Sequence, residues 1–180
     1  MKIKAEIMTG DQMRRALKRM SHEILERNSG ADDLVLLGII SRGVPLAEEI
    51  AANILGIEGV SVPVGALDVS AFDDRRRSDS IVSEMSGVPD PGVDIEGKNV
   101  ILVDDVVYTG RTTRAALDAC SSCGRARTIQ LAVLIDRGHR EIPIRADYVG
   151  KNVPTSRDER VNVLIERVDG VNGVQLVEQE

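Results

Sequence analysis

The sequence predicts an α/β protein with a central, mostly parallel sheet flanked by helices. Apolar runs of the kind that doubly buried strands need occur at residues 34–40, 100–103 and 128–135. Segments with helical spacing of apolar residues lie between them, and this alternation is typical of βαβ units. Ligands of such sheets bind beyond the carboxyl ends of the strands. We therefore expect the turns that follow these three runs to meet at one edge of the sheet.

Length and composition predict one domain, residues 1–180, without a membrane partner. The chain has 180 residues, of which 42% are hydrophobic and 29% charged, as in ordinary globular proteins. No apolar run reaches the ~18 residues of a membrane span, and the first residues lack the apolar segment of a signal peptide. We therefore expect a cytoplasmic protein. With a net charge of −6 and three aromatic residues, nucleic-acid binding would need a local basic patch and could not use a platform of stacked rings.

The N-terminal half begins with a helix that we expect to start at Thr9, because T-G-D-Q has the form of a capping box. The strand at 34–40 ends in the turn Ser41-Arg42-Gly43. Pro45 suits the first turn of the helix that follows and runs to Leu55.

A third strand is expected within residues 60–70, where Pro63 favours an edge position. The polar segment 71–98 comes next. Loops of this length often serve as active-site lids, so we expect a flexible lid or a β-hairpin with residues 80–85 as one arm.

The central stretch, residues 99–116, reads N-V-I-L-V-D-D-V-V-Y-T-G-R-T-T-R-A-A. Asp104 and Asp105 end its strand, and a turn over residues 108–113 leads into a helix. The free N–H groups and positive dipole end of that helix suit a phosphate, and Gly110 permits close approach of a ligand. The carboxylates suit sugar hydroxyls, so the stretch predicts a site for a phosphorylated ribose. It contains neither a Walker loop nor a dinucleotide fingerprint.

The C-terminal part supplies a strand at 128–135 followed by a charged loop, D-R-G-H-R-E-I-P-I-R. Further strands are expected at 147–150, 161–165 and 173–177. Cys120 and Cys123 form a C-x-x-C at the end of a helix, without a second ligand pair, and we interpret them as buried or half-buried thiols.

The 99–116 stretch resembles the phosphoribosyl pyrophosphate (PRPP) loop of type I phosphoribosyltransferases. Together with L-I-D-R-G-H-R-E-I-P-I-R-A-D-Y-V-G-K-N-V-P-T-S and R-R-A-L-K-R-M-S-H-E-I-L-E-R-N, it is similar to the PyrR family over nearly the whole chain. Members of that family regulate pyrimidine operons by attenuation and are also uracil phosphoribosyltransferases. Phe72 and Asp73 replace a tyrosine and an arginine of the family pattern, and Ser41 and Lys18 stand where threonine is common.

The resemblance implies a type I phosphoribosyltransferase fold and the reaction of uracil with PRPP to give UMP and diphosphate, with Mg²⁺ carried on PRPP and no dedicated protein metal site. Arg75, Arg76 or Arg77 would close over the site. The implied catalytic residues are Asp104, Asp105 and Arg42. The implied PRPP-binding residues are Ser41, Arg42, Gly43, Val103, Asp104, Asp105, Tyr108, Thr109, Gly110, Arg111, Thr112 and Thr113. The implied uracil-binding residues are Ile135, Asp136 and Arg137.

The resemblance also implies a surface that binds the leader mRNA of a pyrimidine operon in response to UMP or UTP, and a homodimer or higher homo-oligomer. The implied RNA-binding residues are Arg15, Lys18, Arg19, His22, Arg27, His139, Arg140 and Arg145. From spacing alone, the basic residues near the start are a solvated helix face. Two alternatives stay open at this point: a phosphoribosyltransferase without an RNA-binding role, which could be purine-specific, and a regulator with vestigial catalysis.

Overall fold

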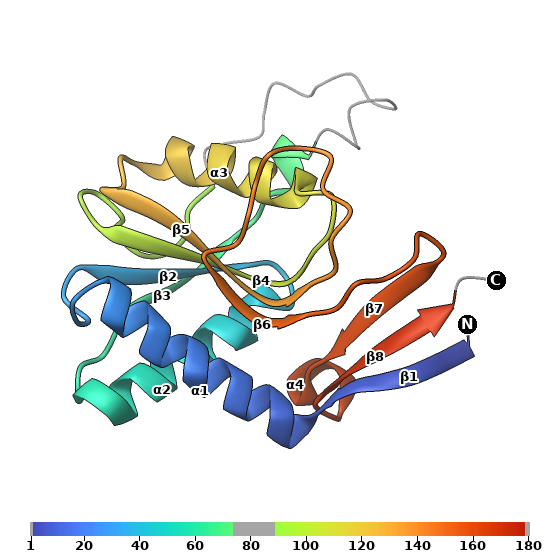
Figure 1. The fold of residues 1–180 in the computed structure, drawn as a ribbon. Helices are drawn as coiled ribbons and strands as arrows, with labels where there is room; N and C mark the ends of the chain where they lie inside the picture. The colour runs from blue at the N-terminus through green and yellow to red at the C-terminus, as the bar shows by residue number, and fades with distance from the viewer. Residues whose placement is uncertain (1, 74–88, 179–180) are drawn as a thin grey trace.

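The computed structural model describes residues 2–73 and 89–178. Its centre is a five-stranded sheet in the order β3-β2-β4-β5-β6, with every neighbouring pair parallel. Helices α1 and α2 cover one face of this sheet and α3 covers the other (Figure 1). The strands are β2 (Leu34–Ile39), β3 (Val64–Leu67), β4 (Asn99–Val107), β5 (Thr128–Asp136) and β6 (Tyr148–Asn152), and the helices are α1 (Gly10–Arg27), α2 (Gly43–Glu58) and α3 (Arg111–Cys123). The predicted fold class is confirmed.

The two core layers follow from alternation along strands that are buried on both faces. All six residues of β2 are buried. Leu36 packs with the α1 and α2 layer, whereas its neighbour Leu37 packs with the α3 layer, because successive side chains of a strand point to opposite faces. Ile101 and Leu102 of β4 divide in the same way. This is the reason that the strands read as unbroken apolar runs.

The strands expected at 161–165 and 173–177 are present, but they pair in a second, antiparallel sheet and not in the parallel one. Its order is β1-β8-β7, and it lies beside the α1 and α2 layer (Figure 1). The strands are β1 (Lys2–Thr9), β7 (Glu159–Leu164) and β8 (Gly173–Glu178), and the short helix α4 (Glu166–Asp169) joins β7 to β8. Neither β1 nor α4 was predicted. In β1 only Met8 is buried, so this strand shows little of the apolar pattern on which strand prediction relies.

Several boundaries agree with the sequence and two differ. Thr9 caps α1 in the predicted capping box with Gln12, and β3 is an edge strand, as Pro63 suggested. However, β3 is shorter than the expected segment, and β4 continues through the aspartate pair to Val107. The two aspartates therefore lie within the paired part of β4 and not in the turn that follows it.

The predicted lid lies mainly outside the described residues. A short 3-10 helix occupies Ser70–Phe72, while the expected hairpin arm at 80–85 and Arg75, Arg76 and Arg77 are not among the residues described. In the described ranges, no helix combines the length and apolar character needed to cross a membrane. Cys120 is buried and Cys123 half-buried, both as free thiols, which confirms that interpretation.

Candidate functional site

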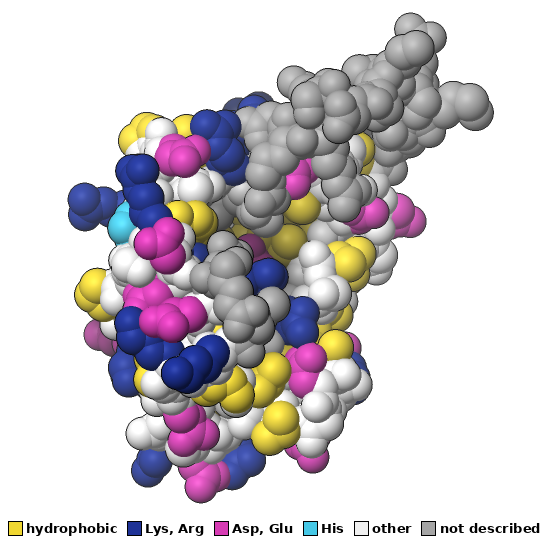
Figure 2. Space-filling model, turned by 90° about the vertical axis from the view of Figure 1, so that its right-hand side faces the viewer, with side chains coloured by type: hydrophobic (Ala, Val, Ile, Leu, Met, Phe, Trp, Pro, Cys, Tyr) yellow, Lys and Arg dark blue, Asp and Glu magenta, His cyan; other side chains and the backbone are white. Residues whose placement is uncertain are grey.

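The turns after β2, β4 and β5 meet at the carboxyl edge of the parallel sheet, as predicted. The three strands are neighbours, and the pairing of β4 with β5 runs on to Val107 opposite Asp136. Figure 2 looks at the molecule from this side, where acidic and basic side chains surround a recess with apolar side chains at its base. The residues implied for PRPP and for uracil therefore share one face of the protein.

The aspartate pair lies near the carboxyl end of β4, with Asp104 buried and Asp105 half-buried. Asp104 is 8% exposed, and one of its carboxylate oxygens accepts the N–H of Asp105 at 2.9 Å. Asp105 is half-buried and accepts the N–H of Val106 at 2.8 Å. Burial raises the pKa of Asp104 well above its usual range, and the neighbouring Asp105 charge raises it further. Perturbed carboxylates of this kind are typical of functional sites.

The turn after β4 prepares the N-terminus of α3 for an anion. Gly110, the N-cap residue, has φ +91°, and a Cβ there would lie 2.9 Å from the Ile142 side chain, so the turn needs glycine on two grounds. The first N–H groups of α3 have no partner within the helix, although the Thr109 hydroxyl accepts from Arg111 at 3.4 Å. Thr112 is half-buried, whereas Thr113 is buried and faces a small cavity against β5.

The charged loop after β5 is fastened to this turn and rises beside α3 (Figure 1). Glu141 donates its backbone N–H to the Thr109 carbonyl at 2.9 Å, and its carboxylate pairs with Arg111 at 2.7 Å. Arg140 donates to the Tyr108 carbonyl at 2.8 Å and also contacts the Asp136 carboxylate. The implied base-binding loop and phosphate-binding turn thus form one connected unit.

Arg137 joins the same unit to the antiparallel sheet. Its guanidinium lies 3.9 Å from the ring centroid of Tyr108 and donates to the Thr155 hydroxyl at 3.0 Å and the Glu159 carbonyl at 2.6 Å. The side chain is buried, which lowers the pKa of Arg137. Its backbone N–H is also engaged, with the Val107 carbonyl. Uracil recognition by Ile135, Asp136 and Arg137 stays a prediction.

The turn after β2 is the third component. Ser41 is exposed, Arg42 is half-buried and Gly43 is buried, and the Ile40–Ser41 peptide is cis. A Cβ on Gly43 would stand 2.2 Å from the Val103 carbonyl oxygen, so the N-terminus of α2 can approach β4 this closely only with glycine. Sequence reasoning placed Arg42 on pyrophosphate but missed its partners here, Val163 and Asp169.

The N-terminal RNA candidates fall into two groups on α1. Arg15, Lys18 and His22 are exposed and make no hydrogen bond or ion pair with another described residue. Arg19 instead donates to the Val149 and Gly150 carbonyls of β6.

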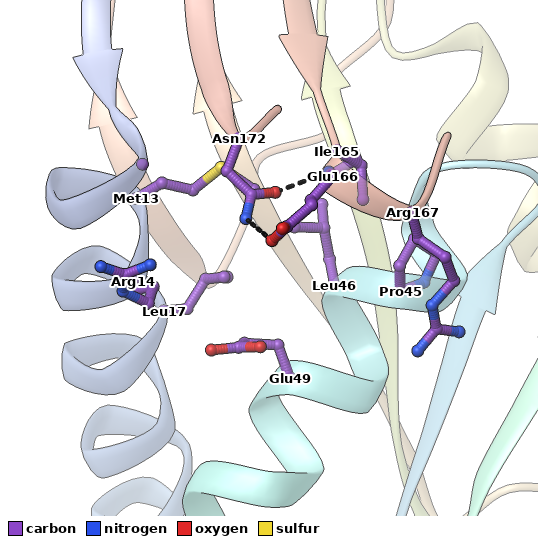
Figure 3. Close-up of a pocket in the computed structure, with 11 residues that line it drawn as sticks. Met13, Arg14, Leu17, Pro45, Leu46, Glu49, Ile165, Glu166, Arg167 and Asn172 are labelled. Carbon is purple, nitrogen blue, oxygen red and sulfur yellow. Dashed lines mark hydrogen bonds between the residues drawn. The ribbon is translucent and has the colours of Figure 1, made fainter. Parts of the chain in front are cut away.

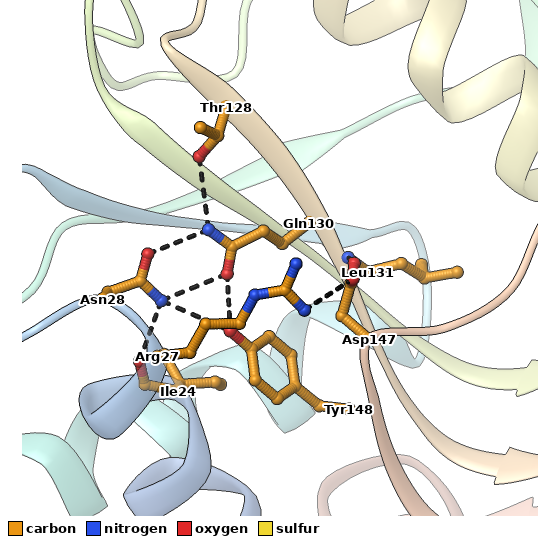
Figure 4. A network of polar contacts seen from close by, with 8 residues as sticks. All are labelled: Ile24, Arg27, Asn28, Thr128, Gln130, Leu131, Asp147 and Tyr148. Atoms are coloured by element: carbon orange, nitrogen blue, oxygen red, sulfur yellow. Dashed lines mark hydrogen bonds and ion pairs between the residues drawn. The ribbon is translucent and has the colours of Figure 1, made fainter.

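Arg27 belongs to the second group and stands at the edge of a polar network. It pairs with Asp147 at 2.7 Å and lies over the Tyr148 ring (Figure 4). Within the network, the Tyr148 hydroxyl donates to Gln130 at 2.5 Å, and Asn28 bonds the same amide. Arg19 and Arg27 therefore connect α1 to β6 within the fold.

The C-terminal RNA candidates lie across the edge strand β6 from α1. His139, Arg140 and Arg145 line a cavity of about 1090 Å³ inside the 137–146 loop, together with Val149 of β6. Arg145 is exposed, whereas Arg140 is half-buried and occupied by its internal partners. Both sets of basic residues thus lie beside β6, but the Arg140 side chain is bonded within the 137–146 loop and to the Tyr108 carbonyl.

A separate pocket of about 370 Å³ lies between α1, α2 and α4, lined by Met13, Leu17, Leu46, Glu49 and Ile165 among others (Figure 3). It contains none of the residues implied for PRPP, uracil or RNA. Among the described residues, no three His, Cys, Asp or Glu side chains converge as a metal site. The carboxylates of Asp104 and Asp105 offer oxygen donors of the type that Mg²⁺ prefers.

Comparison with known proteins gives this geometry a family. The family model described as "Phosphoribosyl transferase domain" matches residues 5–164. "Bifunctional protein PyrR" of Thermoanaerobacter sp. (strain X514) is 58% identical over 179 residues, covering 99% of this chain and 100% of that protein. The proteins of the same name from Thermus aquaticus and Chloroflexus aurantiacus are 54% and 56% identical, covering 100% and 96% of this chain and 99% and 94% of theirs.

Solved structures show the same fold at much lower identity. The hypoxanthine phosphoribosyltransferase of Trypanosoma cruzi superposes with a TM-score of 0.73 at 19% identity, covering 99% of this chain and 98% of that one. A hypoxanthine-guanine phosphoribosyltransferase from Bacillus anthracis gives 0.68 at 21% identity, covering 86% of each chain. The PRPP-type loop at the sheet edge, the domain match and the full-length relatives agree with one another. This chain belongs to the PyrR family of phosphoribosyltransferases.

Proposed function

We propose that this protein transfers phosphoribose from PRPP to uracil, and that it also binds leader RNA of a pyrimidine operon in response to UMP. The observation that carries the transferase half is the β4–α3 junction. There a carboxylate pair, of which Asp104 is buried and Asp105 half-buried, stands directly beside a helix N-terminus that is capped by a glycine and has no side-chain cap. Carboxylates next to an anion site fit a ligand that is phosphate at one end and sugar hydroxyls at the other.

In this proposal each turn holds one part of the substrates. The N-terminus of α3 with Thr109, Gly110 and Thr112 binds the 5′-phosphate. Asp104 and Asp105 hold the ribose hydroxyls and stabilise positive charge that develops on the ring as pyrophosphate departs, as carboxylates do in glycoside hydrolysis. The Ser41–Gly43 turn holds the pyrophosphate.

Positioning and electrostatics then supply most of the rate. Mg²⁺ bound with PRPP would supply charge neutralisation for the departing pyrophosphate. The aspartate pair fits such an ion, because its oxygens are the hard ligands that Mg²⁺ takes. Uracil would lie beside Ile135–Arg137, where the loop fastened to the phosphate turn fixes its distance from the ribose.

The Asp105→Asn variant tests the transferase half. It removes the charge of a half-buried carboxylate while keeping an oxygen that can accept the Val106 N–H, so the fold should persist. We expect UMP formation to fall roughly hundredfold, measured with radiolabelled uracil at saturating PRPP and Mg²⁺. Asp32→Asn, an exposed change at the opposite edge of the sheet, should leave turnover unchanged. Turnover of hypoxanthine but not uracil by the wild type would reject the pyrimidine assignment in favour of a purine enzyme.

The RNA half is supported by the arrangement of basic residues on an acidic protein. The exposed α1 cations and Arg145 lie on the two sides of edge strand β6, and Arg19 connects α1 to that strand. Paucity of aromatic side chains favours recognition of a folded RNA by shape and phosphate contacts. UMP bound at the PRPP site would favour the RNA-binding state of the protein. Because such coupling is reciprocal, RNA would in turn strengthen UMP binding.

A gel-shift titration with the host's pyrimidine-operon leader RNA, with and without UMP, tests this half. We expect binding that UMP strengthens. Absence of binding under both conditions, with a folded and catalytically active protein, would leave a transferase whose basic helix is only solvated. RNA binding without UMP formation would instead support a regulator with vestigial catalysis.

A further inference from the structure

The arginine of the pyrophosphate turn is held by a part of the chain that no predicted motif includes. Arg42 donates from Nε to the Val163 carbonyl of β7 at 2.8 Å. From Nη2 it donates to both carboxylate oxygens of Asp169, at 3.0 and 3.3 Å. The Arg42 side chain is 34% exposed and that of Asp169 is 21% exposed, so the pair is partly shielded from water.

Asp169 is itself held in place by the construction of α4. Its Oδ2 accepts the backbone N–H of Ile165 at 2.8 Å. Figure 3 shows Asn172 bridging the start of α4, where it accepts the Glu166 N–H at 2.8 Å and donates to the Glu166 carboxylate at 3.3 Å. Arg167 extends the anchoring to α2 through an ion pair with Glu48 at 2.6 Å. The carboxylate that faces Arg42 is therefore fixed relative to α2, the helix whose N-cap residue is Arg42.

Two of the three guanidinium nitrogens are thus committed, and the third, Nη1, donates to no described residue. We propose that Asp169 is a positioning residue for the transferase reaction: with the Val163 carbonyl it orients Arg42 so that its free edge meets the pyrophosphate of PRPP. This inference rests on the proposed function. A preorganised guanidinium loses its rotamer freedom on folding and not on binding, which raises affinity.

The negative charge of Asp169 is expected to lower PRPP affinity, whereas its orienting contact with Arg42 is expected to raise it. The two effects therefore predict opposite results for a variant without the charge. A carboxylate beside an anion site weakens anion binding by Coulomb repulsion. If repulsion governed, Asp169→Asn would bind PRPP more tightly. If orientation governs, as we propose, Asp169→Asn binds PRPP about 3- to 10-fold more weakly, since one rotamer-rich side chain must now be ordered on binding.

The experiment measures binding of PRPP with Mg²⁺ by titration calorimetry, and the kinetics of UMP formation, for wild type, Asp169→Asn, Arg42→Lys and the double variant. We expect the KM for PRPP to rise in Asp169→Asn while the KM for uracil stays unchanged. The double variant should bind PRPP within about twofold of Arg42→Lys alone, because Asp169 acts only through the guanidinium. Asp169→Glu, which keeps the charge, should recover part of the affinity. Asp158→Asn, an exposed charge removal near β7, is the matched control and should bind as wild type.

Tighter or unchanged PRPP binding by Asp169→Asn would overturn the inference, as would additive losses in the double variant. Parallel changes in both KM values with a lower melting temperature would also overturn it, because they would show a structural role only. A wild-type protein that binds no PRPP would overturn the proposed function together with the inference, whereas binding by the wild type with an unaffected Asp169→Asn would overturn the inference alone.

Discussion

Gly43 offers a sharp test of how α2 meets the central sheet. In Gly43→Ala the new Cβ would stand 2.2 Å from the Val103 carbonyl oxygen and 3.3 Å from the Gly38 carbonyl carbon. Neither contact is with a flexible side chain. Val103 belongs to β4, which is paired on both sides, with β2 and β5, so the strand cannot move aside. The helix N-terminus must move instead.

The magnitude follows from overpacking. Forcing an extra methyl group into a closely packed site costs about 1–3 kcal/mol. For a chain of this size, each kcal/mol shifts the melting temperature by about 2–4 °C, so we expect a decrease of about 2–12 °C. Displacement of the helix also moves Ser41 and Arg42, and PRPP affinity should fall together with stability.

Gly56 provides a matched control near the other end of the same helix. A Cβ there meets nothing within 4 Å, and the residue is exposed. Gly56→Ala should therefore stabilise the protein by about 0.5–1 kcal/mol through lower backbone entropy of the unfolded chain. Calorimetric melting and PRPP titration of both variants test the reasoning. A Gly43→Ala protein as stable as the wild type would refute the claim that close helix–strand approach requires glycine here.

Three further outcomes follow from the same structure. Burial raises the pKa of Asp104. The stability contributed by its protonated form is therefore present below the pKa of a free aspartate and is lost as pH rises through the raised value. Asp104→Asn should raise the melting temperature at neutral pH but not below about pH 4, and it should abolish turnover. Tyr148→Phe removes the 2.5 Å hydrogen bond to Gln130 and should lower the free energy of unfolding in urea by about 1 kcal/mol. An unchanged free energy of unfolding would show that the hydrogen bond from Asn28 is enough to satisfy the Gln130 side-chain oxygen. Lys18→Ala should weaken RNA binding equally across sequences and lower the slope of log affinity against log salt by about 1, whereas Arg14→Ala on the same helix, where Arg14 is paired with Asp11, should leave that slope unchanged.

The chemistry of the candidate site is encoded locally and was therefore readable from the sequence. A strand buried on both faces is an apolar run, and the residues that follow it in a parallel sheet reach the same edge as those of neighbouring strands. From these rules alone, Ser41–Gly43, the Asp104–Asp105 pair and the loop from Asp136 were expected together. The register of β2, β4 and β5 confirms that expectation.

The partners of long side chains were decided only in three dimensions. Arg140 was predicted for RNA, yet it spans the Tyr108 carbonyl and Asp136 within the loop. Arg42 was predicted for pyrophosphate, but the residue that holds it, Asp169, is 127 positions away in a four-residue helix with no sequence signal.

The same distinction separates the two sheets. The sequence by itself determined the parallel sheet and its phosphate-binding turn, because apolar runs, capping residues and glycine turns act over a few neighbouring residues. The tertiary structure alone decided that β1, β7 and β8 form a separate antiparallel sheet, and that α4 reaches back to the start of α2. Mostly exposed strands carry a weak periodic pattern, and pairing between the two ends of a chain depends on packing that no local pattern records.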